Sequence, residues 1–204
     1  AEGARAFYRL YAARHGKPRW GDKTPNYVFH LSAIESLLPE ARFIHIIRDG
    51  RDVALSLRPL WFSPGDDPAT LAQQWRSFVS SARLQGAGCR SYLEIRYEAL
   101  VLDPETSLRR LADFVDLSDS DRMLEFFRGA AVRLLEHGAR TRANGGVVVT
   151  HEQRAVQQER TTRPLDSSRV FRWKHEMTNT EQSRFEEVGG DLLRDLGYEV
   201  STRE

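Results

Sequence analysis

The chain has 204 residues, of which 40% are hydrophobic and 29% are charged. These proportions are typical of globular proteins, so we expect a single folded domain over residues 1–204 rather than disorder. The 30 Lys and Arg residues against 29 Asp and Glu give a net charge of +1, which disfavours a nucleic-acid or acidic-membrane partner. The single cysteine excludes a disulfide scaffold and a cysteine-rich zinc site. No apolar run is long enough for a membrane span, so a cytoplasmic protein is expected.

The hydrophobic pattern predicts helices and strands in alternation along the chain. In the first half, the expected elements are a helix over 4–15, a strand edge over 18–23, a helix from 25 to about 38, a strand over 42–48, a helix over 52–57, a loop over 63–68 and a helix over 69–85. In the second half, they are a strand over 91–97, helices over about 104–115 and 120–127, a loop over about 138–166 and a helix over 179–196.

The strand over 42–48 decides the expected fold class. It is a near-continuous apolar run, which is typical of strands buried on both faces of a parallel sheet. Alternation of such strands with helices predicts an α/β protein whose parallel sheet is flanked by helices.

The segment over 43–56, FIHIIRDGRDVALS, carries the clearest chemical signal. A strand ends at Arg48, a turn follows, and Ser56 lies in the next helix. Ligands of open α/β sheets bind beyond the carboxyl ends of the strands, and a guanidinium there suits a phosphate. An alternative from the same spacing is that Arg48 pairs with Asp52 while Ser56 bonds to its own helix.

The nine residues 48–56, RDGRDVALS, closely resemble the 3′-phosphate-binding motif of sulfotransferases that use 3′-phosphoadenosine-5′-phosphosulfate (PAPS). In that family the arginine and the serine eight residues later hold the 3′-phosphate of the nucleotide. The resemblance therefore implies that Arg48 and Ser56 bind PAPS, within a fold similar to that of P-loop NTPases.

A second segment, GDKTP over 21–25, resembles the lysine-containing segment of the same family. The resemblance implies that Lys23 is catalytic and neutralises charge on the leaving oxygen as the sulfur–oxygen bond breaks. Some relatives place a catalytic histidine two residues after this lysine, where this chain has Pro25, so we assign no catalytic base.

Three later segments also resemble the family. The run RYEAL over 96–100 matches a strand-end motif whose tyrosine binds the nucleotide in tyrosylprotein-type members, and SRVFRW over 168–173 matches a late nucleotide-contacting segment. A loop before it resembles the lid over the cofactor. The additional PAPS-binding residues implied are Tyr97, Thr161, Arg163 and Arg172.

The loop that holds the 5′-phosphosulfate in this family has no counterpart in the sequence. It contains a Ser-Gly-Thr-Thr-like turn, whereas neither Ser-Gly nor Gly-Thr occurs in the 204 residues. We therefore expect a fold that is incomplete at the N-terminus, belonging to a fragment of a longer bacterial-type sulfotransferase similar to the tyrosylprotein and heparan branch.

The resemblance implies transfer of a sulfuryl group from PAPS, without a metal, to a hydroxyl or amine of an unknown small-molecule or glycan acceptor. Two alternatives remain open. One is a non-catalytic module that binds PAPS or its 3′,5′-bisphosphate product. The other is a relative of P-loop nucleotide kinases, which predicts a Gly-x4-Gly-Lys-Ser/Thr motif that the chain does not contain.

Overall fold

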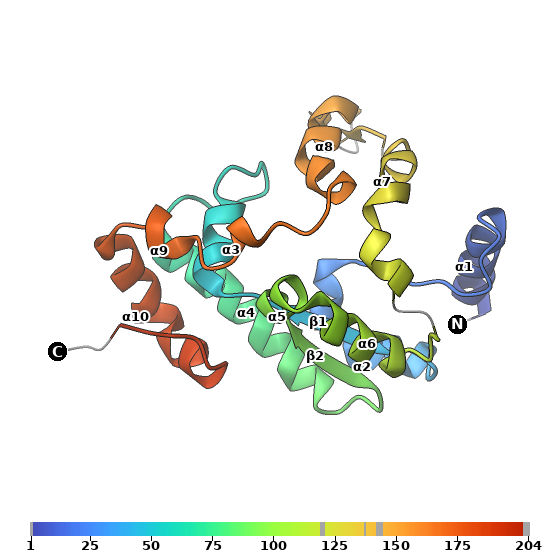
Figure 1. Ribbon diagram of the computed structural model, residues 1–204, viewed down its shortest axis with the longest axis horizontal. Coiled ribbons are helices and arrows are strands. Elements are labelled where there is room, and N and C mark those ends of the chain that lie inside the picture. Colours follow the sequence, from blue (N-terminus) through green and yellow to red (C-terminus); the bar gives the residue numbers. More distant parts are fainter. Residues whose placement is uncertain (1, 119–120, 137, 142–144, 202–204) are drawn as a thin grey trace. The chain divides into compact units, whose positions relative to one another are not determined.

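The computed structural model of the chain describes residues 2–118, 121–136, 138–141 and 145–201. It divides the chain into two compact units (Figure 1). The first unit comprises residues 1–94 and 172–204, and the second unit comprises residues 95–171. The two stretches of the first unit are thus separated in sequence by the whole of the second.

The first unit begins with the helix α1 (Glu2–Arg14), the 3-10 helix η1 (Pro25–Phe29) and the helix α2 (Leu31–Leu37). The structure confirms the helix predicted over 4–15. The continuous helix predicted from residue 25 is wrong, because it divides at His30, whose φ of −139° and ψ of 17° are not helical. The strand predicted over 18–23 is also wrong: this segment is coil, and its one large apolar side chain, Trp20, stacks on Tyr8 of α1 at 4.2 Å.

The strand β1 (Phe43–Ile47) is followed by the helices α3 (Gly50–Leu57) and α4 (Pro68–Gly86) and by the strand β2 (Tyr92–Arg96). β1 and β2 are neighbours in a parallel two-stranded sheet, as the sequence predicts. The prediction that β1 is buried on both faces is wrong, because Ile44 and Ile46 are 42% and 49% exposed. An apolar run therefore identifies this strand correctly but overstates its burial.

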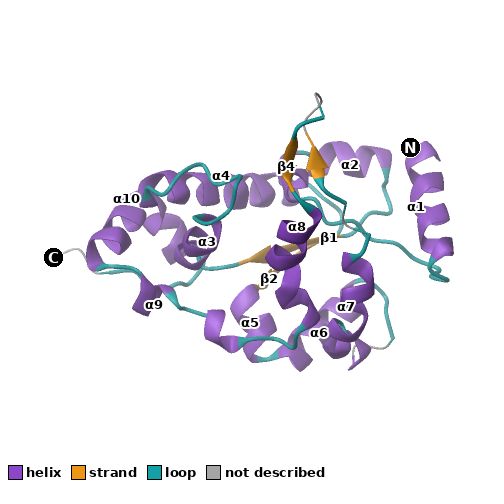
Figure 2. Ribbon diagram, turned by 90° about the horizontal axis from the view of Figure 1, so that it is seen from above, coloured by secondary structure: helices purple, strands orange, loops and turns teal. Residues whose placement is uncertain are grey.

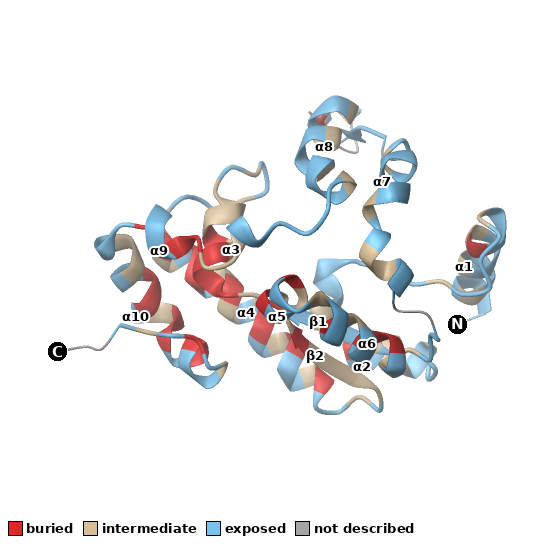
Figure 3. Ribbon diagram, in the orientation of Figure 1, coloured by how far each residue is buried: buried red, intermediate tan, exposed pale blue. Residues whose placement is uncertain are grey.

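The core of the first unit lies where α3, α4 and α10 (Asn179–Asp195) pack together, which Figure 3 shows as a run of buried residues. Leu71, Phe185 and Leu193 are fully buried there, and Trp75 is 4% exposed. Complete burial of one such side chain contributes about 1.5–3 kcal/mol. The C-terminal stretch of the chain is thus held against α3 by a shared apolar core.

Side chains at the helix starts define where α4 and α10 begin. Asp67 accepts a hydrogen bond from the backbone N–H of Thr70, and Thr178 forms a capping box with Glu181. These contacts satisfy N–H groups that lack partners within a helix. The short helix α9 (Trp173–Glu176) lies just before α10. Among the described residues, no helix is long and apolar enough to cross a membrane.

The second unit contains the helices α5 (Tyr97–Leu102), α6 (Pro104–Phe114), α7 (Phe127–Leu134) and α8 (His151–Gln158), the strands β3 (Arg140–Thr141) and β4 (Val147–Val149), and the 3-10 helices η2 (Asp121–Glu125), η3 (Glu159–Thr162) and η4 (Ser167–Arg169). β3 and β4 form an antiparallel hairpin, drawn in orange in Figure 2.

Two predictions in this unit need correction. The predicted helix over 120–127 is a 3-10 helix over residues 121–125, and α7 begins only at Phe127. The loop predicted over 138–166 contains the hairpin and α8. A capping box between Thr150 and Gln153 starts α8, which compensates for the weak apolar periodicity of that segment.

Candidate functional site

The junction between β1 and α3 is fixed by contacts with the core. Asp49 caps α3 by accepting a hydrogen bond from the backbone N–H of Arg51 at 2.9 Å. Trp75 Nε1 donates to the backbone carbonyl of Arg48 at 3.2 Å. A Cβ atom at Gly50 would lie 2.5 Å from the Trp75 ring, so the close approach of α3 to α4 requires glycine here. Arg48 therefore leaves the strand from a well-anchored backbone.

Arg48, Ser56 and Arg172 meet around one oxygen atom, and we call these three residues the candidate anion site. Arg48 Nη1 donates to Ser56 Oγ at 3.2 Å, and Arg172 Nη2 donates to the same atom at 3.0 Å. Arg172 lies 116 positions after Ser56 in the sequence and is 9% exposed. Two guanidinium groups thus converge on one hydroxyl, an arrangement that suits a phosphate oxygen.

The contacts of the alternative interpretation of this motif are also present. Arg48 Nη2 lies 3.5 Å from Asp52 Oδ2, and Ser56 Oγ donates to the backbone carbonyl of Asp52 at 2.9 Å. Local pairing within residues 48–56 accounts for these two contacts. It does not account for Arg172, which brings a second cation to Ser56 from a distant part of the sequence.

The backbone around Arg172 is held by α3. The backbone N–H of Trp173 donates to Asp52 Oδ1 at 2.9 Å. Arg172 Nη1 donates to Glu176 Oε2 at 3.0 Å, one turn later. Phe171 has a φ of 56°, a left-handed conformation that is rare for a bulky residue. The path of the chain into Arg172 is therefore imposed by tertiary contacts rather than by local preference.

A buried ion network around Arg51 joins α3 to the C-terminal stretch. The Arg51 guanidinium forms a fork with Asp49 at 3.0 and 2.8 Å and donates to Glu186 Oε1 at 2.7 Å. It also donates to the Glu199 carbonyl at 2.7 Å and lies 3.4 Å from the centre of the Trp173 ring. Local sequence patterns do not reveal this network, because Glu186 is 135 positions from Arg51 and no spacing links them.

The predicted catalytic residue, Lys23, lies in exposed coil before η1 and not at a strand end. Among the described residues, no carboxylate lies within ion-pair distance of its ammonium. The structure does not bring Lys23 into hydrogen-bond contact with the candidate anion site. Its catalytic role stays a prediction.

The three other predicted nucleotide-binding residues belong to the second unit. Tyr97 is the half-buried first residue of α5. Thr161 lies in η3, where its hydroxyl donates to the carbonyl of Gln158 at 2.7 Å. Arg163 follows η3 and pairs with Glu159. Their roles in binding stay predictions.

A separate polar cluster lies between β1, β2 and α4. His45 Nδ1 is 2.6 Å from the Tyr92 hydroxyl, which donates to Glu94 Oε1 at 3.0 Å, and Arg83 pairs with Glu94 at 3.3 Å. Burial lowers the pKa of His45 and raises that of Tyr92. These contacts indicate that His45 is a hydrogen-bonded structural residue of the sheet.

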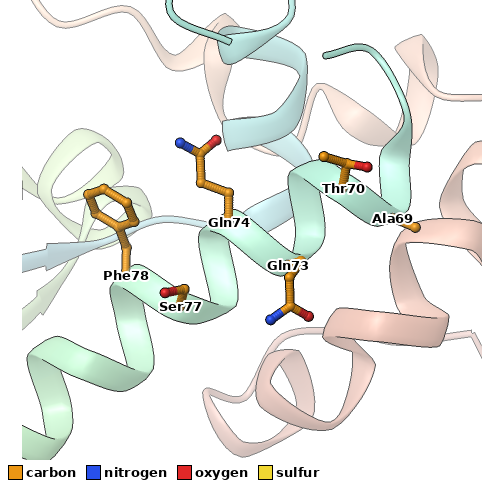
Figure 4. Close-up of a pocket in the computed structure, with 6 residues that line it drawn as sticks. All are labelled: Ala69, Thr70, Gln73, Gln74, Ser77 and Phe78. Atoms are coloured by element: carbon orange, nitrogen blue, oxygen red, sulfur yellow. The ribbon is translucent and has the colours of Figure 1, made fainter. Parts of the chain in front are cut away.

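Two hollows in the described part of the surface lie away from the candidate anion site. One, of about 540 Å³, is lined only by residues of α4: Ala69, Thr70, Gln73, Gln74, Ser77 and Phe78 (Figure 4). In this view Gln74 and Phe78 point to one side of the helix and Gln73 to the other, so the lining is an open helix surface. A second, of about 780 Å³, lies between α4, α10 and residues 200–201. The first has no charged lining residue. In the second, the arginines Arg76 and Arg194 lie among the carboxylates of Glu186, Glu187 and Asp191, so positive charge does not dominate its lining.

The chain is similar in sequence to known sulfotransferases and related proteins. Residues 1–121 match the model of the sulfotransferase family. The chain is 29% identical to the nodulation protein NoeE of Sinorhizobium fredii over 97% of the chain and 49% of that protein. It is 30% identical to the omega-hydroxy-beta-dihydromenaquinone-9 sulfotransferase Stf3 of Mycobacterium tuberculosis over 67% of the chain and 37% of that protein.

The chain thus spans half the length or less of these curated relatives. Among solved structures, it resembles the sulfotransferase domain from the curacin biosynthetic pathway with a TM-score of 0.61. That alignment covers 95% of the chain and 69% of the solved domain, with 18% identity, and it shows a shared fold.

Proposed function

Because the chain belongs to the sulfotransferase family, we propose that it acts in transferring a sulfuryl group from PAPS to a hydroxyl or amine acceptor. The observation that carries this proposal is the convergence of Arg48 and Arg172 on Ser56 Oγ. In the proposed complex, these residues bind the 3′-phosphate of the nucleotide.

The chemistry of the candidate anion site supports a phosphate ligand. A phosphate carries several acceptor oxygens, so it can receive hydrogen bonds from two guanidinium groups and a hydroxyl at once. Arg172 now donates to Glu176, whose side chain is 48% exposed. A phosphate is the stronger acceptor for Arg172, and an exposed carboxylate can turn into solvent when the nucleotide binds.

The proposed reaction is an in-line displacement at sulfur. The acceptor oxygen or nitrogen forms a bond to sulfur and loses its proton, while the bond from sulfur to the bridging phosphate oxygen breaks. Adenosine 3′,5′-bisphosphate leaves with the electron pair of that bond. The protein contributes mainly by positioning the reactants and by stabilising charge, as in phosphoryl transfer. No step in this scheme requires a metal ion.

In this scheme Lys23 neutralises the charge that develops on the leaving oxygen. A compact ammonium suits that task, and only three of the 30 cationic residues of the chain are lysines. Tyr97, Thr161 and Arg163 supply further contacts to the nucleotide. These assignments rest on the sequence motifs of the family.

The acceptor that we favour is a hydroxyl. The name of the Mycobacterium tuberculosis relative specifies an omega-hydroxy substrate. The protonation state of the acceptor adds a physical reason, since an aliphatic amine is largely protonated near neutral pH and an alcohol is not. A panel of phenols, alcohols and amines with a labelled PAPS donor separates these acceptor classes.

The test of the nucleotide site is a comparison of two ligands by isothermal titration calorimetry. We expect the chain to bind adenosine 3′,5′-bisphosphate more tightly than adenosine 5′-phosphate, because only the former has a 3′-phosphate. Charged hydrogen bonds contribute about 1.5–3 kcal/mol each. Arg48→Ala should therefore reduce the preference roughly 10- to 100-fold.

The matched control is Arg14→Ala, which removes an exposed arginine from α1. It should leave the preference for the 3′-phosphate unchanged. Equal affinity of the two nucleotides for the unmodified chain would show that the chain holds no 3′-phosphate site.

A further inference from the structure

Asp52 contacts both arms of the candidate anion site with one carboxylate. Its side chain is 0% exposed. Oδ2 lies 3.5 Å from Nη2 of Arg48, and Oδ1 accepts a hydrogen bond at 2.9 Å from the backbone N–H of Trp173, the residue after Arg172. Trp173 lies 121 positions after Asp52, so one side chain reaches both a neighbouring residue and a distant segment of the chain.

The backbone conformation before Arg172 shows that this placement is imposed. Phe171 adopts a φ of 56°, which an L-residue with a large side chain avoids unless the surrounding structure requires it. The hydrogen bond from Trp173 to Asp52 fixes the chain two residues later. Arg172 lies between these two points, so the direction of its side chain depends on the anchor at Asp52.

The same carboxylate restricts Arg48. An arginine side chain has several rotatable bonds and loses conformational freedom when it binds a ligand. A buried carboxylate beside its guanidinium holds that group near Ser56 Oγ, which it contacts at 3.2 Å. The conformational cost of ordering Arg48 is then met in the folded protein before the anion binds.

We propose that Asp52 is a positioning residue of the candidate anion site, which aligns Arg48 and Arg172 for a 3′-phosphate; this inference rests on the function proposed above. Electrostatic repulsion alone predicts that Asp52 weakens phosphate binding. A buried negative charge beside a phosphate site repels the phosphate, so its removal would tighten binding if positioning played no part. The two accounts therefore predict changes of opposite sign.

The experiment measures how strongly each variant prefers adenosine 3′,5′-bisphosphate over adenosine 5′-phosphate. The measure is the Kd for adenosine 5′-phosphate divided by the Kd for adenosine 3′,5′-bisphosphate, so a smaller ratio means a weaker preference. Asp52→Asn keeps an oxygen that can accept from the Trp173 N–H but loses the charge that faces Arg48. We expect it to reduce the ratio about tenfold, which corresponds to one charge-assisted hydrogen bond. Asp52→Ala loses both contacts and should reduce the ratio further.

The ratio separates positioning from a loss of stability. A lower folded fraction weakens the apparent affinity for both nucleotides by the same factor, so their ratio does not change. The matched control is Asp67→Asn. Asp67 also accepts from a backbone N–H, that of Thr70 at 3.0 Å, and pairs with Arg184 at 2.6 Å, but it contacts no member of the candidate anion site. We expect its ratio to equal that of the unmodified chain.

The outcomes distinguish this inference from the proposed function. If the unmodified chain has no preference for the 3′-phosphate, the proposed function fails. If it has the preference and Asp52→Asn retains or increases it, then the positioning role is wrong and the nucleotide site stands.

Discussion

Replacing Arg51 by methionine should strongly destabilise the first unit. The Arg51 side chain is 1% exposed, and its partners Asp49 and Glu186 are 0% and 7% exposed. The substitution removes the cation that both carboxylates contact and leaves them buried without it. Removing one partner of a buried ion pair costs about 3–5 kcal/mol, because the desolvation of the remaining charge is no longer offset.

Urea denaturation, monitored by tryptophan fluorescence, measures this loss of stability. With a slope of about 1–3 kcal/mol per molar urea, the midpoint should fall by at least about 1 M. Arg51→Lys should give an intermediate loss, because an ammonium keeps the charge but cannot form the fork with Asp49. The double variant Arg51→Met/Glu186→Gln should lose less than the sum of the single variants, because a neutral amide no longer needs the cation.

The control for this prediction is Arg184→Met, which removes an exposed arginine from α10. Arg184 pairs with Asp67 in a solvent-exposed contact, and such pairs contribute little to stability. An equal midpoint for Arg51→Met and Arg184→Met would contradict the reasoning, because it would mean that the buried network does not stabilise the fold.

Three further predictions address pH, packing and catalysis. The hydrogen bond from Arg184 lowers the pKa of Asp67 from 3.8 to about 2. The contribution of Asp67 to stability is therefore present above its ordinary pKa and is lost as the pH falls towards 2. In denaturation curves, the stability difference between the unmodified chain and Asp67→Asn should shrink over that range. Gly50→Ala should lower stability by about 1–3 kcal/mol, because its Cβ would lie 2.5 Å from the Trp75 ring. Gly3→Ala should not lower stability in this way, because a Cβ there would have nothing within 4 Å. Equal denaturation midpoints for the two variants would refute this packing argument. In a longer protein that also carries the family's 5′-phosphosulfate loop, Lys23→Ala should lower kcat about 10²–10³-fold with little change in the PAPS Kd. A variant that weakens PAPS binding but keeps kcat would make Lys23 a binding residue.

Much of the first unit could be predicted from local sequence patterns. The strand β1, the turn after it and the helices α1, α4 and α10 follow from apolar periodicity and from glycine. Secondary structure is harder to predict in short segments with few apolar residues. The helix α8 has little apolar periodicity, but the spacing of Thr150 and Gln153 is a capping-box signature that could have revealed its start.

The candidate anion site could be predicted in part. The spacing of Arg48 and Ser56 across a strand–helix junction points to their contact. The meeting of Arg172 with Ser56 spans 116 positions, and only the family resemblance suggests it. The roles of Asp52 and Arg51 depend on partners 121 and 135 positions away, so tertiary packing determines them and no local pattern predicts them.

The most direct test of the account is a crystal structure of the chain with adenosine 3′,5′-bisphosphate. We predict that the 3′-phosphate accepts hydrogen bonds from Arg48, Ser56 and Arg172, with Asp52 still bonded to the Trp173 N–H. A 3′-phosphate bound elsewhere, with both guanidinium groups still on Ser56 Oγ, would contradict the assignment of this cluster as the nucleotide site.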